Sequence, residues 1–379
     1  MASPGERYLL PAGLSDGLAP DSGHEAAMVE RLIGVFAAWG YERVKPPLIE
    51  FEDSLLSGPG EAMAADTFRL MDPVSQRMMG LRADMTPQVG RIAASRLKNA
   101  PRPIRLSYAG EVLRVKGEQL RPERQIGQAG VELIGTTAAA ADAEVVLLGA
   151  EALLGVGAPE LVVDLNVPTL APAILKAAGI ADPRPLVAAL DRKDLTAVRQ
   201  SAGASAPILE ALIQAVGPAE PALAALEALP LSGEAAAQRE RLREVVALLR
   251  KARPEMTLTV DPTDHRGFEY HTGITFSLLA PRVRGDFGRG GRYVNQAGEP
   301  ATGFTLYLDT LMRALPPPQA AARVFLPLGT DPAAARRLRD EGWVTIHGIE
   351  PVADPAAEAR RLGCARLWRE GRLEAIEKL

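Results

Sequence analysis

The chain has 379 residues, of which 47% are hydrophobic and 24% charged, a globular composition that excludes a wholly disordered protein. Its 43 basic and 47 acidic residues give a net charge of −4, which argues against general nucleic-acid binding. A single cysteine, Cys364, excludes an intrachain disulfide framework and a Cys-rich metal site, and the four histidines lack HExxH or HxH spacing. We therefore expect no nucleic-acid partner, no metal ion and no cofactor.

The N-terminus lacks a basic segment followed by a long apolar core, so it does not resemble a secretory signal. The chain also lacks a run of roughly 18 apolar residues, the length that a membrane-spanning helix needs. We expect no membrane partner and a cytoplasmic location. At about 100–200 residues per domain, the length indicates two or three domains.

The clearest helix is predicted over 22–39, where apolar residues recur at helical spacing. Ser22 and Glu25 predict a capping box, and Gly40 is placed to end the helix. A strand over 41–45 stops at Pro46-Pro47, which indicates the edge of a sheet. Further predicted elements are two short strands within 67–82 around Asp72-Pro73, a helix near 87–98, strands at 104–115 and 124–135, a helix at 137–155 and a strand at 160–165.

The pattern changes at about residue 167, where helical spacing with Pro and Gly breaks continues to 255. Strands are predicted again at 256–260, 270–279 and 301–306, with a Gly-rich turn at 285–291 and a helix at 307–315. Beyond the Pro316–Pro318 linker, strands and helices alternate. The predicted fold class is α+β: an antiparallel sheet with flanking helices (1–166 and 256–315), an inserted helical subdomain (167–255) and a small C-terminal α/β unit (319–379).

The strand at 124–134 has a period-2 pattern that divides its side chains between two faces. One face holds Gln128, Gly130, Glu132 and Ile134, and the other holds Ala129, Val131 and Leu133. The first face could form the floor of a ligand site, with Gly130 letting a ligand approach the backbone. A strand with one solvated face explains the same pattern.

Three other motifs have alternative interpretations. Arg266 follows a Pro-Thr-Asp turn and could bind a carboxylate, although by itself an ordinary surface arginine is favoured. The segment from Gly285 to Arg292 suggests a phosphate cradle, but a glycine-rich hairpin turn is favoured because no kinase catalytic loop precedes its Asp-Phe-Gly. Cys364 has no histidine nearby in sequence and is interpreted as structural.

The order of these motifs over about residues 8–315 resembles the catalytic domain of histidyl-tRNA synthetases, which are class II aminoacyl-tRNA synthetases. The first class II motif is similar to the helix at 22–39, Trp39-Gly40-Tyr41 and Pro47. The second is similar to Leu113-Arg114 through Gly130-Val131-Glu132. The histidine-specific segments resemble Arg82–Thr86, Arg266–His271 and Gly290–Tyr293.

This resemblance implies a pocket for free L-histidine. Asp84, Thr86 and Gln128 would hold the α-ammonium group, Glu132 would accept from the imidazole, and Arg266 would pair with the carboxylate. Tyr270 and His271 would line the imidazole end, and the retained Arg114 completes the implied histidine-binding set. Asp84 replaces a glutamate of the synthetases and His271 replaces a tyrosine, while the charges still complement those of the ligand.

The nucleotide side departs from the synthetase pattern at three positions. Lys116 stands where a glutamate reads the adenine amino group, Thr310 replaces the arginine that clamps the γ-phosphate, and Tyr307 replaces a glycine and would crowd the nucleotide. Losing one such electrostatic contact typically costs about 10²–10³ in rate. A retained histidine pocket with a lost nucleotide site is therefore the informative combination.

This combination resembles the regulatory subunits of ATP phosphoribosyltransferase, a family of synthetase paralogues in histidine biosynthesis. The resemblance implies a non-catalytic chain that supports the short-form catalytic subunit, mediates feedback inhibition by histidine, and forms a homodimer core within a hetero-octamer. The alternatives are an active histidyl-tRNA synthetase or another ATP-dependent amino-acid ligase. Both need ATP, and the tail after Pro318 is short for an anticodon-binding domain and has no conspicuous basic run.

Overall fold

The computed structural model describes residues 8–117, 121–158, 160–265, 270–315 and 321–376. The chain divides into two compact units, Met1–Pro316 and Pro317–Leu379. Among the described residues, no helix has the length and apolar character needed to cross a membrane.

The first unit is built on a nine-stranded sheet. Its strands, in spatial order, are β1 (Glu42–Arg43), β5 (Ile104–Leu113), β6 (Gln125–Ile134), β12 (Pro300–Tyr307), β11 (Gly288–Val294), β10 (His271–Leu279), β7 (Val162–Asn166), β9 (Thr257–Asp261) and β8 (Gly217–Pro218). Neighbouring strands are antiparallel except for the β1–β5 and β7–β9 pairs, which are parallel. The sheet and its helices confirm the predicted α+β class, and β1 confirms the predicted edge strand.

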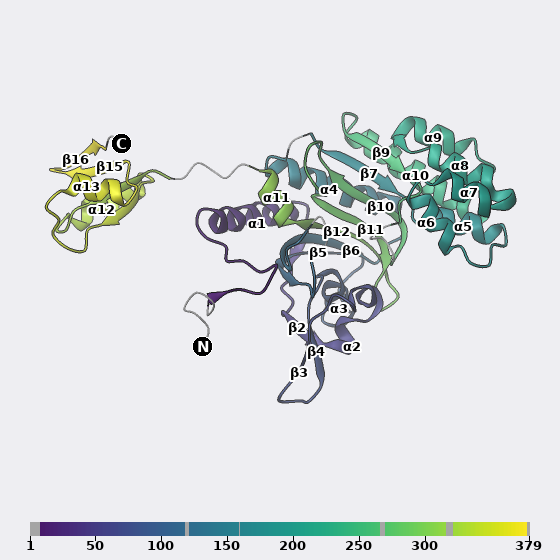
Figure 1. Cartoon of the computed structure of the whole chain (residues 1–379), viewed down its shortest axis with the longest axis horizontal. Coiled ribbons are helices and arrows are strands. Elements are labelled where there is room, and N and C mark those ends of the chain that lie inside the picture. Colours follow the sequence, from purple (N-terminus) through teal and green to yellow (C-terminus); the bar gives the residue numbers. More distant parts are fainter. Residues whose placement is uncertain (1–7, 118–120, 159, 266–269, 316–320, 377–379) are drawn as a thin grey trace. The chain divides into compact units, whose positions relative to one another are not determined.

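One face of the sheet is covered by α1 (Asp21–Ala38), α4 (Ala139–Gly155) and α11 (Leu308–Ala314) (Figure 1). Val131 and Leu133 of β6 are buried in the same apolar core as these helices, as the period-2 pattern predicts. The predicted capping box is wrong, because α1 begins at Asp21 and no side chain caps it, so Ser22 already lies inside the first turn. The helix ends at Ala38, and Gly40 follows the C-cap residue Trp39 with a φ of +81°, a conformation that favours glycine, so the predicted stop is confirmed.

A smaller three-stranded sheet is formed by β2 (Ile49–Phe51), β4 (Met78–Leu81) and β3 (Arg69–Met71), accompanied by α2 (Glu52–Leu55), the 3₁₀ helix η2 (Gly58–Met63) and α3 (Thr86–Ser95). The predicted strand pair around Asp72-Pro73 is confirmed. The predicted turn at 285–291 is wrong from Gly288 onward, because those residues lie in β11. Its glycines serve packing instead: a Cβ at Gly290 would lie 2.3 Å from the Gly303 carbonyl oxygen.

Helices fill the segment between β7 and β9. They are α5 (Leu170–Ala177), α6 (Arg184–Asp191), α7 (Leu195–Ser201), the 3₁₀ helix η3 (Gly203–Ser205), α8 (Ala206–Gln214), α9 (Ala219–Glu227) and α10 (Gly233–Ala252). They gather beside the end of the sheet that contains β7 and β9 (Figure 1). Leu242 and Leu249 of α10 are fully buried in the same core as the central sheet. Burial of this apolar stripe ties the helices to the sheet.

The second unit has a four-stranded sheet in the order β14 (Val344–His347), β13 (Arg323–Leu326), β15 (Arg366–Arg369) and β16 (Arg372–Ala375), with helices α12 (Pro332–Asp340) and α13 (Pro355–Arg361). Strand β16 was not predicted. It follows a tight turn at Glu370-Gly371, both with positive φ, and such a pair is typical of two-residue hairpins. Cys364 is buried beside Phe325 and Leu367, in agreement with a structural role.

Candidate functional site

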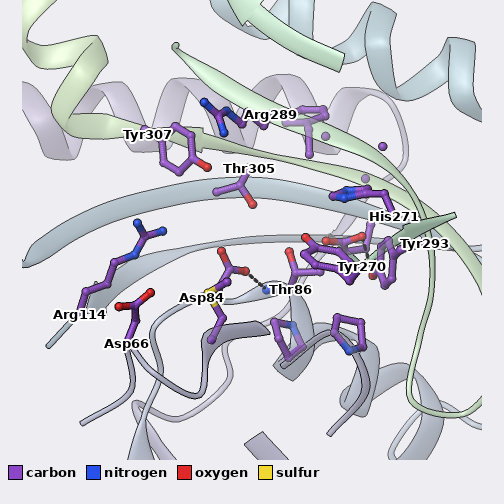
Figure 2. Close-up of a pocket in the computed structure, with 18 of the residues that line it drawn as sticks. Asp66, Asp84, Thr86, Arg114, Tyr270, His271, Arg289, Tyr293, Thr305 and Tyr307 are labelled. Carbon is purple, nitrogen blue, oxygen red and sulfur yellow. Dashed lines mark hydrogen bonds between the residues drawn. The ribbon is translucent and has the colours of Figure 1, made fainter. Parts of the chain in front are cut away.

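A pocket of about 150 Å³ lies on the face of the central sheet where β6, β11 and β12 run side by side. Its floor follows the strand period, since alternate residues share a face. The lining residues that follow this period are Arg289, Gly291 and Tyr293 of β11, Gly303, Thr305 and Tyr307 of β12, and Glu132 of β6; Gly290 and Phe304 line the pocket as well. The 84–87 segment, at the start of α3, forms an opposite wall (Figure 2).

Glu132 lies at the bottom of the pocket with only 1% of its surface exposed. The Tyr293 hydroxyl donates to Glu132 Oε2 at 2.8 Å. Burial raises the pKa of Glu132 to about 8, and the nearby Asp84 charge adds to the rise, while hydrogen bonds from Tyr293 and Thr86 oppose it. A Cβ at Gly303 would lie 2.2 Å from Glu132 Oε2, so glycine is needed opposite this carboxyl. The result is a buried acid suited to a cationic or N–H-donating ligand group.

Gly130 does not provide the ligand access that its position suggested. A Cβ there would lie 2.3 Å from the Phe304 carbonyl oxygen and 2.5 Å from the Tyr108 hydroxyl. That hydroxyl lies 2.7 Å from Oγ1 of Thr305, a residue that lines the pocket. The predicted approach of a ligand to this backbone is therefore wrong, because protein atoms occupy the space. The alternative of a solvated face is also wrong, since both faces of β6 are buried.

The Asp84 carboxylate is held by its own loop and by β6. Its Oδ1 accepts from the Thr86 backbone N–H at 2.8 Å (Figure 2). Its Oδ2 accepts from Gln128 Nε2 at 3.1 Å, and Gln128 Oε1 accepts from the Met85 backbone N–H at 3.2 Å. Gln128 is fully buried and does not line the pocket. It therefore positions Asp84 from behind.

Aromatic rings form one end of the pocket (Figure 2). Tyr270 and His271 stack with ring centroids 4.3 Å apart and an interplanar angle of 24°. Tyr270 meets Tyr293 edge to face at 5.8 Å. Both contacts are stacked or edge-to-face, the arrangements that aromatic pairs favour, so this end is an aromatic wall next to the Glu132 carboxyl.

Arginines and Tyr307 form the other end. The Arg121 guanidinium lies 3.7 Å from the centroid of the Tyr307 ring. It also donates to the Asp286 carboxylate at 2.5 Å and to the Asp286 carbonyl at 3.0 Å, while Arg289 Nε donates to the same carboxylate at 2.5 Å. The chain's own side chains thus occupy this end and neutralise one another.

Thr310 and Lys116 offer no substitute for a phosphate clamp. The Thr310 side chain is fully buried under the sheet and accepts from Arg313 Nη2 at 3.2 Å. Lys116 is exposed and does not line the pocket. Within the described ranges, no group of three or more His, Cys, Asp and Glu side chains is placed to hold a metal ion.

Known proteins resemble this chain over most of its length. The family model described as histidyl-tRNA synthetase matches residues 13–311. The ATP phosphoribosyltransferase regulatory subunit of Rhodospirillum centenum is 57% identical over 97% of this chain and 96% of its own length, and that of Paramagnetospirillum magneticum is 56% identical over 99% and 100%. The chain belongs to the family of ATP phosphoribosyltransferase regulatory subunits. The predicted resemblance is thereby confirmed.

Solved structures agree on the fold of this family. A Bacillus halodurans protein titled ATP phosphoribosyltransferase regulatory subunit/histidyl-tRNA synthetase superimposes with a TM-score of 0.81 at 23% identity, covering 93% of this chain and 96% of that one. A Nostoc histidyl-tRNA synthetase gives a TM-score of 0.77 at 18% identity, covering 95% of this chain and 90% of its own. At these identities the similarity establishes the class II synthetase-like fold.

The structure brings most of the predicted site residues of this regulatory subunit together. The residues that line the pocket are Asp84, Thr86, Arg114, Glu132, Tyr270 and His271. Gln128 lies behind Asp84, and Arg266 lies outside the described residues. Sequence reasoning left Arg289 and Tyr293 out of the site, although Arg289 lies in the segment that it interpreted as a glycine-rich turn and Tyr293 ends the Gly290–Tyr293 block that resembles the synthetases. Treating Arg289, Gly291 and Tyr293 as alternate residues of one strand would have placed them on the pocket face.

Proposed function

We propose that this regulatory subunit binds free L-histidine, performs no aminoacylation, and makes a short-form ATP phosphoribosyltransferase catalytic subunit both active and sensitive to histidine. The observation that supports this most is the division of the pocket. One end presents Glu132 and Asp84 to a ligand, whereas Arg121 and Tyr307 occupy the other end.

Histidine fits the chemistry of the first end. Its α-ammonium group would pair with Asp84 beside Thr86, and its imidazole would donate to Glu132 between the rings of Tyr270 and Tyr293. An N–H donor on the ring stabilises the ionised form of Glu132, which burial alone disfavours. Carried over from the synthetase resemblance, Arg266 would pair with the ligand carboxylate, and Arg114 would lie toward the same polar end.

The test is calorimetry with the purified full-length chain, followed by an exchange assay. We expect L-histidine to bind. Histidinol, which lacks the carboxylate, and L-glutamine, which lacks the imidazole ring, are the control ligands for these two groups. We expect no histidine-dependent ATP–pyrophosphate exchange, because Thr310 and Tyr307 replace nucleotide contacts. Robust exchange by protein free of contaminating synthetase would instead support the alternative, an active amino-acid ligase.

The partner follows from the family name, since a regulatory subunit needs a catalytic one. We propose a homodimer of this chain at the core of a hetero-octamer of four regulatory and four catalytic chains, assembled in the cytoplasm. Co-expression followed by native mass spectrometry measures the stoichiometry. Phosphoribosyltransferase kinetics with and without histidine then test whether this chain confers both activity and inhibition, as linkage between ligand and assembly requires.

A further inference from the structure

The turn between α6 and α7 is attached to the segment that leads into the pocket wall. Lys193 Nζ donates to both carboxylate oxygens of Asp261, at 2.9 and 2.7 Å, and to Thr263 Oγ1 at 2.5 Å. The His265 backbone N–H donates to Asp191 Oδ1 at 3.1 Å. The helices of residues 170–252 therefore contact the segment 261–265 at two points.

The backbone of this turn is an unusual place for a lysine. Lys193 has a φ of +56°, in the left-handed region that favours glycine. Its N–H bonds to the Leu190 carbonyl and the next N–H, of Asp194, bonds to the Ala189 carbonyl, which is the Schellman arrangement. Asp194 then caps α7 by accepting from the Ala197 N–H at 3.0 Å. A residue in this sparsely populated conformation persists where its surroundings hold it, and here the Lys193 side chain makes three hydrogen bonds.

The segment 261–265, which makes these contacts, leads along the chain to the pocket. Thr263 is fully buried and donates to Asp261 Oδ1 at 2.7 Å, so the lysine contacts a preformed turn. His265 is the last described residue before 266–269, and the chain resumes at Tyr270 and His271, which line the pocket. Asp261 also ends β9, whose neighbour β7 pairs with β10, the strand that begins at His271. Covalent and sheet connections therefore both link the lysine to the aromatic end.

We propose that Lys193 couples the amino-acid pocket to the helical insertion, so that an occupied pocket orders α6 and α7. The inference rests on the proposed histidine binding and adds the element that transmits it. Lys193 touches no ligand and acts as a positioning residue. A ligand that binds the ordered state better shifts the population toward it, and the coupling is reciprocal. The insertion thereby becomes the part of the chain through which occupancy reaches a partner.

The experiment compares the full-length parent with Lys193→Gly and Lys193→Asn. Both replacements tolerate positive φ, so each removes the ammonium group without adding backbone strain. Gln76→Gly is the matched control, because Gln76 also has a φ of +56° but lies exposed in the β3–β4 hairpin. Calorimetry first measures L-histidine affinity, and hydrogen exchange with mass spectrometry is then followed at saturating histidine.

In the parent and in Gln76→Gly, we expect histidine to slow amide exchange severalfold over residues 184–201 as well as around the pocket. In both Lys193 variants, the slowing should remain near 84–95 and 271–279 but disappear from 184–201. If the parent binds histidine without protecting 184–201, or if the variants retain that protection, the coupling is overturned while the proposed function stands. If the parent does not bind histidine, calorimetry alone shows that the proposed function has failed, and this inference fails with it.

Discussion

The two ends of the pocket share one sheet face and the same strand alternation, yet they differ in what satisfies their polar groups. At the aromatic end, the buried Glu132 carboxyl accepts from the Tyr293 hydroxyl and faces the cavity. At the other end, two arginines already neutralise Asp286, and a tyrosine ring covers one of them. The aromatic end therefore presents a buried carboxyl to the cavity, whereas at the other end the polar groups contact one another.

The largest expected effect is on the pH dependence of stability. The pKa of Glu132 is raised to about 8, so between its ordinary value and 8 the folded chain holds a proton that the unfolded chain lacks. The stability that Glu132 contributes through this extra proton is fully present below the ordinary pKa and is lost as pH rises toward 8. Relative to Glu132→Gln, the parent should lose on the order of 4 kcal/mol between pH 4.5 and pH 8, by about 1.4 kcal/mol per unit. Denaturant titrations at several pH values measure the difference.

Glu144→Gln is the matched control for this experiment. Glu144 also accepts from a tyrosine hydroxyl, that of Tyr41, at 2.9 Å. Burial would raise the pKa of Glu144, but hydrogen bonds from Arg105 and Tyr41 lower it overall. Its contribution should therefore be present above its ordinary pKa and lost as pH falls, the opposite sign. Parallel curves for the parent and Glu132→Gln would contradict a raised pKa at Glu132.

The next effect concerns ligand affinity. We expect Glu132→Gln to weaken L-histidine binding by tenfold or more at pH 7, because hydrogen bonds to charged groups are worth about 1.5–3 kcal/mol. The amide keeps the shape of the side chain but cannot take the charge that a bound imidazole stabilises. The melting temperature at pH 7 should not fall and should rise instead, because the neutral amide avoids the free-energy cost of keeping Glu132 protonated in the folded chain at a pH where the unfolded carboxyl ionises. Unchanged affinity by calorimetry would remove Glu132 from the binding site.

Period-2 alternation in β6 was enough to predict the faces of this strand, because side-chain direction in a strand is a local property. The resemblance to the synthetases then identified Asp84, Glu132, Tyr270 and His271 as neighbours, although they come from distant segments. The direct role given to Gln128 was less accurate, since period alone does not distinguish a lining residue from one that supports it from behind.

Other features depend on packing that a sequence pattern does not contain. The glycines of β11 were interpreted as a turn because glycine is typical of turns, whereas here close approach of neighbouring strands requires them. The prediction that a ligand approaches the Gly130 backbone failed for a similar reason. The Tyr108 hydroxyl that fills this space comes from the neighbouring strand β5, which the pattern of β6 alone does not contain. The stacking of Arg121 on Tyr307 was also unforeseen, because it depends on a loop meeting the end of β12.

The smallest expected effect lies at the end of the pocket that Arg121 and Tyr307 occupy. There we expect stability to fall and histidine affinity to stay nearly constant, the reverse of Glu132→Gln. In Arg121→Lys the charge remains, but the planar group that stacks on Tyr307 and donates to Oδ1 and to the backbone carbonyl of Asp286 is lost. We expect the free energy of unfolding at pH 7 to fall by about 1–2 kcal/mol. Histidine affinity should change by less than about twofold, because these contacts satisfy one another away from the aromatic end. Arg184→Lys repeats the substitution at an exposed pair with Asp182, where we expect no measurable loss of stability because solvent screens the pair. A large loss of histidine affinity in Arg121→Lys would show that both ends still act as one binding site.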